Sequence, residues 1–532
     1  SSQAPGLNRA PAVGIAGSGR PNDVTPVGTT RRRSYICKAG QFARLGYNFI
    51  VVHMNSKARV LHWFRTDLRI HDAPALQAGL ALKPQAWYPV WCWDPEYVYS
   101  HRVGVNRFNF LIESMNDFSQ SLTKLNDKSK LLVVRGSPYS VLPKLFHDWK
   151  ITHLVYEIDT GGYAQERDRR VRELAARSKV EVLAVLGHSL YHPAEIIEKN
   201  GGKATTTITQ WQKAASKLGS VPRPTAAPKK LVPPGDLHLS SLSREDHPVN
   251  RDHDLNEKTR IGPVTCFDTL TGPKGDFAIP TLVELGYPTP TTTIHGGETA
   301  GRARLFAFNA DDEGNRAALF EKPNTSPAVP GPFGTCQPTS ALKEQSDSDA
   351  QEDSECEDFP EDIQIDVTKP STTLMSPYLK FGCVGVRECY WSWHDILMKA
   401  PKSAKKPENL LGQLEFRDMY YAAELAVGGT TFARVQGNPI CRYIPWNCPT
   451  VYSEEGDPII PRPEDEKHPQ AEEWLAAWSE GRTGFPWIDA LMRQLREEGW
   501  MHHLGRHSVA CFLTRGQCYI SWERGAEVFD GK

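Results

Sequence analysis

The sequence predicts an α/β domain built on a doubly wound parallel sheet, followed by an all-α domain. Between Arg59 and Leu186, short runs rich in apolar and β-branched residues alternate with stretches of helical periodicity. Strands separated by helices return in the same direction, so this alternation favours a parallel sheet with helices on both faces. Beyond Gly296 the patterns become helical. The chain has 532 residues, enough for two or three domains with sizeable cores.

The elements of the first domain can be assigned in order from these patterns. The expected strands are 60–64, 85–93, 131–134, 154–156 and 180–186. The expected helices are 105–125, 140–149 and 165–176. Together they define an α/β domain over residues 57–190.

Composition marks the remaining boundaries. Residues 1–56 are rich in Ser, Gly, Pro and Arg and are predicted to be a disordered extension. This extension is either a transit peptide, which would also be poor in acids, or a segment upstream of a natural start at Met54. Residues 191–295 are predicted to be an interdomain linker and residues 296–532 the helical domain. Acidic, Pro-rich insertions are expected at about 324–362 and 448–468.

Charge and cysteine content limit the classes of partner and compartment. The net charge is −1, but residues 1–53 carry seven basic residues and one acidic residue, and residues 344–362 carry ten acidic residues and no basic one. The rest of the chain is slightly basic, which is compatible with a nucleic-acid partner. The 11 cysteines are scattered without a CxxC pair, which favours free thiols in a reducing compartment. No apolar run is long enough to span a bilayer, so we expect no membrane association.

A cluster of histidines near the C-terminus is the strongest local signal. It lies in the run 491–515, which is predicted to be one continuous helix. Residues three and four apart share a helix face, so Trp500, His503 and His507 should point together, with Arg506 beside them. The cluster could hold structural histidines, a metal ion or a pair of catalytic imidazoles.

Five separated motifs carry a resemblance to a known family. They are Val60–Arg69, Thr372–Leu379, Gly412–Asp418, Gly437–Cys441 with Ile444–Trp446, and Gly481–Asp489. In this order they resemble the photolyase and cryptochrome family over about residues 58 to 530. Cyclobutane-dimer photolyases generally have Asn at the position of His503, whereas residues 502–516 resemble the (6-4) photolyase and animal-type cryptochrome branch. Members of the family continue for several more helices, so the resemblance implies a C-terminally truncated chain that binds FAD weakly.

The resemblance implies a non-covalent FAD site in the helical domain. The implied cofactor-binding residues are Thr372, Thr373, Leu374, Met375, Ser376, Gln413, Arg417, Trp500, His503 and Arg506. Short hydroxyls and backbone amides at a helix start suit a pyrophosphate, although Ser376 followed by Pro377 also reads as a simple helix N-cap. Arg417 and Arg506 could stabilise a reduced flavin, or they could pair with Asp418 and Glu498.

The same resemblance implies the remaining roles. His503 would be the general acid for a (6-4) lesion and His507 its partner in orientation, with no metal involved. A lesion flipped out of DNA would contact Gln413, Phe416 and Trp487, and stack on Trp500 as well, with Lys322 on a phosphate. Trp446 and Trp522 match members of the family's electron-transfer chain. Each aromatic residue taken alone could equally be a core residue.

The predicted function is therefore light-driven repair of (6-4) photoproducts by electron transfer from reduced FAD. The alternatives are a cryptochrome photoreceptor with signalling partners and no repair activity, and a flavin-free DNA-binding protein. The resemblance also allows an antenna chromophore, a folate or a deazaflavin, in the α/β domain. We expect UV-damaged DNA as the partner, a monomer, and a nuclear location, with a mitochondrial or cytoplasmic location as alternatives.

Overall fold

The computed structural model divides into two units, residues 1–44 and 45–532. It describes residues 58–94, 103–240, 269–309, 317–318, 320, 372–399, 410–439, 441–452, 458–459 and 468–531. All of these residues lie in the second unit. The predicted extension 1–56, the acidic insertion 324–362 and Lys322 lie outside the described residues.

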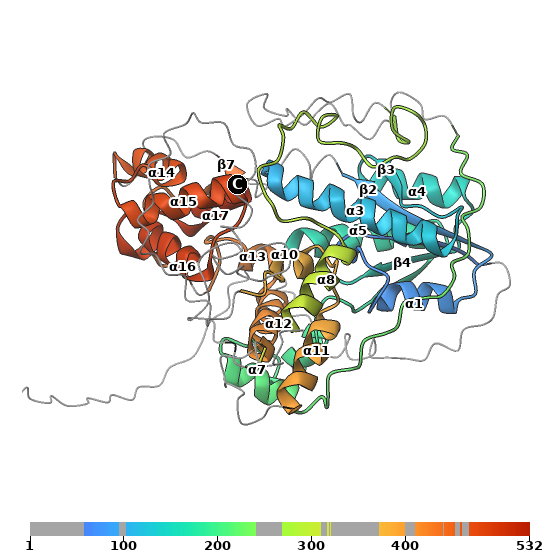
Figure 1. Cartoon of the computed structure of the whole chain (residues 1–532), viewed down its shortest axis with the longest axis horizontal. Coiled ribbons are helices and arrows are strands. Elements are labelled where there is room, and N and C mark those ends of the chain that lie inside the picture. The colour runs from blue at the N-terminus through green and yellow to red at the C-terminus, as the bar shows by residue number, and fades with distance from the viewer. Residues whose placement is uncertain are drawn as a thin grey trace, which may run out of the picture. The chain divides into compact units, whose positions relative to one another are not determined.

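A five-stranded sheet forms the first part of the second unit (Figure 1). Its strands are β1 (Arg59–Trp63), β2 (Ala86–Trp93), β3 (Leu132–Arg135), β4 (His153–Glu157) and β5 (Glu181–Val185). They are ordered β3-β2-β1-β4-β5, and every neighbouring pair is parallel. The central strand β1 pairs Val60 with Trp87 of β2 on one side and with His153 of β4 on the other. The predicted doubly wound parallel sheet is confirmed.

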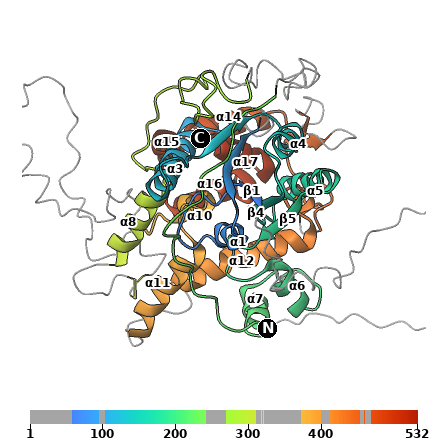
Figure 2. The ribbon, with the colours of Figure 1, turned by 90° about the vertical axis from the view of Figure 1, so that its right-hand side faces the viewer.

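Side chains of successive strand residues enter different cores on the two faces of the sheet. On β4, Val155 joins one core, whereas Leu154 and Tyr156 join the other. The first core is closed by α1 (Pro74–Ala81) and α3 (Val105–Leu125), and the second by α4 (Pro138–Asp148) and α5 (Gly162–Arg177). Figure 2 shows α3 on one side of the sheet and α4 and α5 on the other. The continuous apolar runs in the strands therefore reflect burial on both faces.

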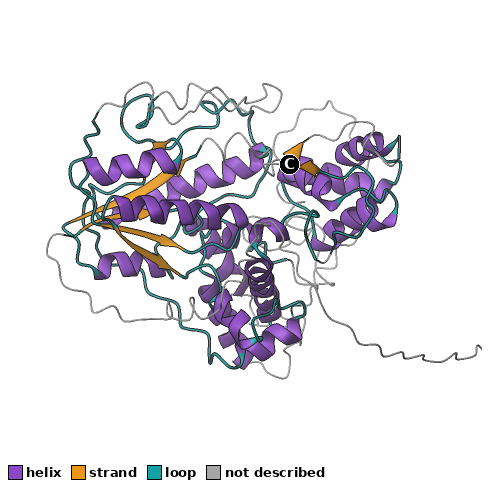
Figure 3. Ribbon diagram, turned by 180° about the vertical axis from the view of Figure 1, so that it is seen from behind, coloured by secondary structure: helices purple, strands orange, loops and turns teal. Residues whose placement is uncertain are grey.

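The remaining described elements are mainly helices (Figure 3). They are α6 (Pro193–Lys199), α7 (Ile208–Ala215), α8 (Glu298–Asn309), α10 (Ser376–Lys380), α11 (Val386–Lys399), α12 (Leu410–Val427), α13 (Gly429–Phe432), α14 (Ala471–Glu480), α15 (Pro486–Glu498), α16 (His503–Cys511), the π-helical turn η5 (Phe512–Gly516) and α17 (Trp522–Asp530). Two short strands, β6 (Val451–Tyr452) and β7 (Pro458–Ile459), form an antiparallel pair. The fold class, an α/β domain followed by a helical region, agrees with the prediction.

Two local predictions need correction. The predicted linker 191–295 contains α6 and α7, whose residues Ile196 and Trp211 are buried in one core with Met419 of α12. The predicted single helix over 491–515 is broken. It ends at Gly499, which has a left-handed φ of 64°, and resumes at His503. Glycine adopts this conformation without the strain that a Cβ would add, so Gly499 stops α15.

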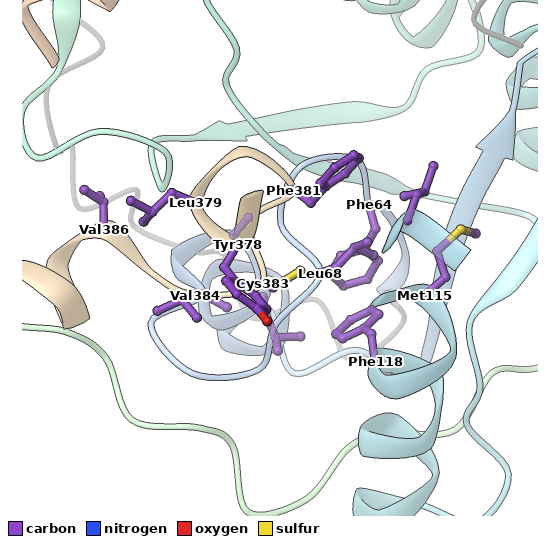
Figure 4. Close-up of a cluster of buried hydrophobic side chains, with 14 of the residues drawn as sticks. Phe64, Leu68, Met115, Phe118, Tyr378, Leu379, Phe381, Cys383, Val384 and Val386 are labelled. Atoms are coloured by element: carbon purple, nitrogen blue, oxygen red, sulfur yellow. The ribbon is translucent and has the colours of Figure 1, made fainter. Parts of the chain in front are cut away.

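The loop around α10 is packed against the carboxyl end of the sheet. Phe64 and Leu68, which follow β1, lie in one apolar core with Tyr378, Phe381 and Cys383 (Figure 4). Polar contacts reinforce this packing, because Nη1 of the buried Arg69 donates to the carbonyl of Gly382 at 3.0 Å. The segment around α10 is thus fixed directly to the α/β domain.

Candidate functional site

The segment Thr372–Met375 forms a loop that leads into α10. Leu374 has a φ of 51°, in the left-handed region that few non-glycine residues adopt. The N-cap of α10 is Met375, and no side chain caps the helix. The prediction that Ser376 is the N-cap is therefore wrong, because Ser376 already lies inside the first turn and Pro377 follows it. The helix begins one residue earlier than the Ser-Pro pattern indicates.

The chemistry of this loop fits a pyrophosphate group. The hydroxyl of Thr372 is buried and has no hydrogen-bond partner among the described residues. Arg304 of α8, which sequence reasoning missed, donates from Nε to the carbonyl of Thr373 at 2.7 Å and from Nη2 to that of Thr372 at 3.5 Å. Burial lowers the pKa of Arg304 to about 10, which leaves the guanidinium charged at neutral pH. An unsatisfied hydroxyl beside a buried cation is suited to an anionic ligand.

Helix α12 carries the next group of predicted residues. Arg417 donates to the carbonyls of His188 at 2.7 Å and Leu379 at 3.4 Å, and its guanidinium lies over the ring of Tyr421. It thereby joins α12 to α10 and to the loop after β5. The expected pairing with Asp418 is loose, with a separation of 3.7 Å. Gln413 is half-buried on the same helix, and Phe416 is 45% exposed.

Asp418 and His188 are two groups near Arg417 whose pKa values are shifted. Asp418 is buried and accepts from the backbone amide of Leu190 at 2.6 Å. Burial raises its pKa to about 7, although the neighbouring Arg417 charge and the amide hydrogen bonds oppose this. Burial, and then the Arg417 charge, hold the pKa of His188 well below its usual value. His188 is therefore a neutral imidazole at physiological pH.

The histidine cluster is carried by the first turns of α16. His502 is the N-cap, and its Nδ1 accepts from the amide of Leu504 at 3.3 Å. His503 is half-buried, with its ring 4.2 Å from that of His502, and His507 follows one turn later. The prediction that Trp500 shares their helix face is wrong, because Trp500 lies in the break between α15 and α16. Trp500 is buried there, and its ring meets that of His502 edge-on.

The surroundings of α16 differ from the expected ion pairs. Nε of Arg506 donates to the carbonyl of Met501 at 2.9 Å rather than to Glu498. Glu498 instead accepts from Gln494 at 3.0 Å. Nε2 of His507 lies 3.6 Å from the thiol of Cys511, a contact that the sequence analysis missed although its spacing of four residues was visible. In the described part of the chain, no three His, Cys, Asp or Glu residues are grouped to hold a metal ion.

The two predicted electron-transfer residues lie in one small region. Trp446 is buried, and its ring centroid is 5.3 Å from that of Tyr519, which is 39% exposed. The strand-like segment at Asn447 pairs with Ile520, which fixes this contact. Trp522 starts α17 and is half-buried. Tyr519 was not predicted, since only the fold brings it onto Trp446.

Trp487 follows Pro486 at the start of α15 and is 58% exposed. The loop before it is held by Asp489, whose carboxylate accepts from the amides of Thr483 at 2.7 Å and Gly484 at 3.0 Å. Among the described residues, neither Gln413, Phe416 nor Arg417 makes a hydrogen bond, ion pair or ring contact with α16. The described contacts of Arg417 join α12 to α10 and to the loop after β5.

No helix among the described residues is long and apolar enough to cross a membrane.

Comparison with known proteins finds family matches for the α/β domain and for the C-terminal helical region. Residues 60–229 match the family model described as DNA photolyase, and residues 410–532 match that of the FAD binding domain of DNA photolyase. Cryptochrome-2 of Gallus gallus is 36% identical over 478 residues, which cover 89% of this chain and 65% of that protein. The (6-4)DNA photolyase of Arabidopsis thaliana is 35% identical over 493 residues, covering 90% of this chain and 71% of that protein.

The fold is also similar to that of a solved protein. The crystal structure of a Synechocystis sp. cryptochrome superimposes with a TM-score of 0.62 at 22% identity, covering 90% of this chain and 78% of that one. At this identity the likeness concerns the fold alone. The chain spans 65% of the length of the chicken cryptochrome, so it matches about two thirds of that relative.

Proposed function

Because this chain belongs to the photolyase and cryptochrome family, we propose that it repairs (6-4) photoproducts in UV-damaged DNA, using light and a reduced FAD. Its helical part contains the FAD-binding domain of that family. The 35% identity to a (6-4) photolyase supports this substrate class, and the adjacent imidazoles of α16 support the chemistry. The expected compartment is the nucleus, where the substrate lies.

The observation that carries the proposal is the pair His503 and His507 on successive turns of α16. A (6-4) lesion must take up a proton as it accepts an electron, and an imidazole with a pKa near neutrality suits that transfer. His503 starts the helix with its ring against the buried His502, which limits how far the imidazole can swing. His503 is the proposed proton donor and His507 orients it.

A reduced flavin held here would supply the electron for repair. The residues of the chain hold and surround it. The α10 loop and Arg304 suit its pyrophosphate, and Gln413 on α12 suits either the flavin edge or a flipped base. Phe416 and Trp487 are exposed aromatic side chains on which an extruded base can stack. Trp446 and Tyr519 form a path from the interior to solvent for recharging the flavin with electrons.

A photoreceptor function is the second candidate, favoured by the 36% identity to a cryptochrome. In that case light would reduce FAD and alter binding to a signalling partner, with no repair. The residues of the flavin site serve both functions, so the geometry of α10 and α12 does not separate them. Whether illumination repairs a damaged DNA strand separates the two functions.

The test is illumination of the FAD-loaded protein with an oligonucleotide that carries one (6-4) lesion. Restored thymines are counted by chromatography in the wild type, His503→Ala and His507→Ala. His238→Ala is the matched control, because His238 is exposed in a loop far from α16 in sequence. We expect repair by the wild type and the control, a loss of about 100-fold or more for His503→Ala, and a smaller loss for His507→Ala.

Unchanged repair by His503→Ala would refute the proposed acid. Tight binding of the lesion with no repair by the wild type would instead favour the photoreceptor.

A further inference from the structure

Arg304 is a buried cation without an ionic partner. Its side chain comes from α8, and the residue is 5% exposed. No carboxylate among the described residues forms an ion pair with it, and its described bonds go to the carbonyls of Thr372 and Thr373. Burying an uncompensated charge is costly, so such a residue is rarely kept for packing alone.

The bonds made by Arg304 fix the direction of two peptide groups. In a trans peptide the N–H points opposite to the C=O of the preceding residue. Because Arg304 holds the carbonyls of Thr372 and Thr373, the amides of Thr373 and Leu374 point away from it. Neither amide has a hydrogen-bond partner in the part of the chain that the structure describes.

The other features of the loop agree with an anion on that far side. Leu374 has a left-handed φ of 51°, and successive amides next to such a residue form a concave nest for anions. The buried hydroxyl of Thr372 also lacks a partner among the described residues. The loop therefore offers two amides and one hydroxyl, with a positive charge behind them.

We propose that Arg304 is a positioning residue that orients the Thr372–Leu374 loop to bind the pyrophosphate of FAD and supplies part of its counter-charge. The inference rests on the proposed flavin site but not on repair. It differs from a purely structural clamp, because a clamp would stabilise the loop equally for any flavin. If Arg304 serves the pyrophosphate, its removal should weaken the binding of those flavins alone that carry phosphates.

The experiment compares FAD with riboflavin, which has the same ring system and no phosphate. Dissociation constants for both are measured by flavin fluorescence for the wild type, Arg304→Met, Arg304→Lys and Thr372→Val. Arg302→Met is the matched control, because Arg302 lies on the same helix but is paired with Glu388 at 2.8 Å. Far-UV circular dichroism shows which variants are folded.

We expect Arg304→Met to weaken FAD binding by about tenfold or more and riboflavin binding by less than about twofold. Arg304→Lys should restore part of the preference for FAD, and Thr372→Val should lose part of it with Arg304 intact. Arg302→Met should leave the preference unchanged. Equal weakening of both flavins by Arg304→Met, or no weakening, would overturn the inference.

Failure of the proposed repair function gives a different result. A protein that binds FAD with a preference lost in Arg304→Met, yet repairs no lesion, contradicts the repair proposal and supports the role of Arg304.

Discussion

Trp446 shows how one residue acquires a testable role from its neighbour. Its buried ring contacts the exposed Tyr519, so an electron taken from Trp446 can be replaced from the surface. We expect Trp446→Phe to slow the light-driven reduction of bound FAD strongly, because phenylalanine is far harder to oxidise than tryptophan. Absorbance of the flavin under blue light with an external reductant measures the rate. Trp474→Phe, a partly buried tryptophan beside His468, is the control and should leave the rate unchanged.

The raised pKa of Asp418 should make the free energy of unfolding depend on pH. Burial raises its pKa to about 7 in the folded state, above the ordinary value of the unfolded chain. The folded state therefore binds the extra proton between about pH 4 and 7. Its contribution to stability is complete below that window and is lost as the pH rises through it, at up to about 1.4 kcal/mol per pH unit. Asp418→Asn should remove this slope.

Urea unfolding of wild type and Asp418→Asn at pH 5 and pH 7.5 measures the effect. The variant should become more stable relative to the wild type at the higher pH. The control is Asp395→Asn. Hydrogen bonds with Arg223 and His394 lower the pKa of the exposed Asp395, so this carboxyl group stays ionised throughout the window. A difference between wild type and Asp418→Asn that does not change with pH would contradict the raised pKa.

At the scale of single elements, the loop before α15 depends on one carboxylate. Burial alone would raise the pKa of Asp489, but the hydrogen bonds from Thr483 and Gly484 outweigh it and lower the pKa. Asp489→Asn cannot accept all of these bonds, so we expect a loss of about 1–2 kcal/mol in unfolding free energy at pH 7. The loss should shrink as acid protonates Asp489 in the wild type.

Urea unfolding at pH 7 checks this value. Asp530→Asn is the control, because the substitution removes an exposed ion pair between the Asp530 carboxylate and Arg107 at 2.7 Å and should cost less than about 1 kcal/mol. Equal losses for the two variants would mean that the Asp489 hydrogen bonds add nothing.

A helix or strand could be predicted from the sequence where a single hydrophobic periodicity runs through its whole length. The helix expected at 105–125 is α3, since its apolar residues keep one period over its whole length. The helix expected at 491–515 was wrong, because Leu495 and Val509 keep a helical spacing across the break and only Gly499 signals it. The short helix α7 was missed because it lies among Pro, Thr and Lys residues, and its burial depends on contact with α12.

At the scale of the whole molecule, the site depends on contacts between segments distant in sequence. The motif around Thr372 was found from the sequence, but Arg304 was not, since its isolated position on α8 gives no signal. The packing of Phe64 near Phe381 likewise follows from the three-dimensional fold alone. The sequence thus pointed to the Thr372 loop as a candidate binding segment, and the structure added Arg304, whose guanidinium holds two carbonyls of that loop.

Gly382 lies where the segment after α10 comes close to the loop after β1. Its φ is 66°, and a Cβ there would lie 1.8 Å from the carbonyl oxygen of Thr66, in the loop after β1. Gly428 also has a positive φ, 93°, but a Cβ there would meet nothing within 4 Å. Replacing either glycine by alanine would therefore strain the backbone, but only at Gly382 would the added Cβ also clash with a neighbouring atom.

We expect Gly428→Ala to cost about 1 kcal/mol in unfolding free energy, and Gly382→Ala to cost several times more or to prevent folding. Urea unfolding followed by tryptophan fluorescence measures both variants. Gly382→Ala should also weaken FAD binding, because the α10 loop is anchored through the Arg69 bond to this residue. If the two alanine variants were equally stable, the close approach of α10 to the end of β1 would be absent in solution. The loop proposed to bind the pyrophosphate would then be positioned without the sheet.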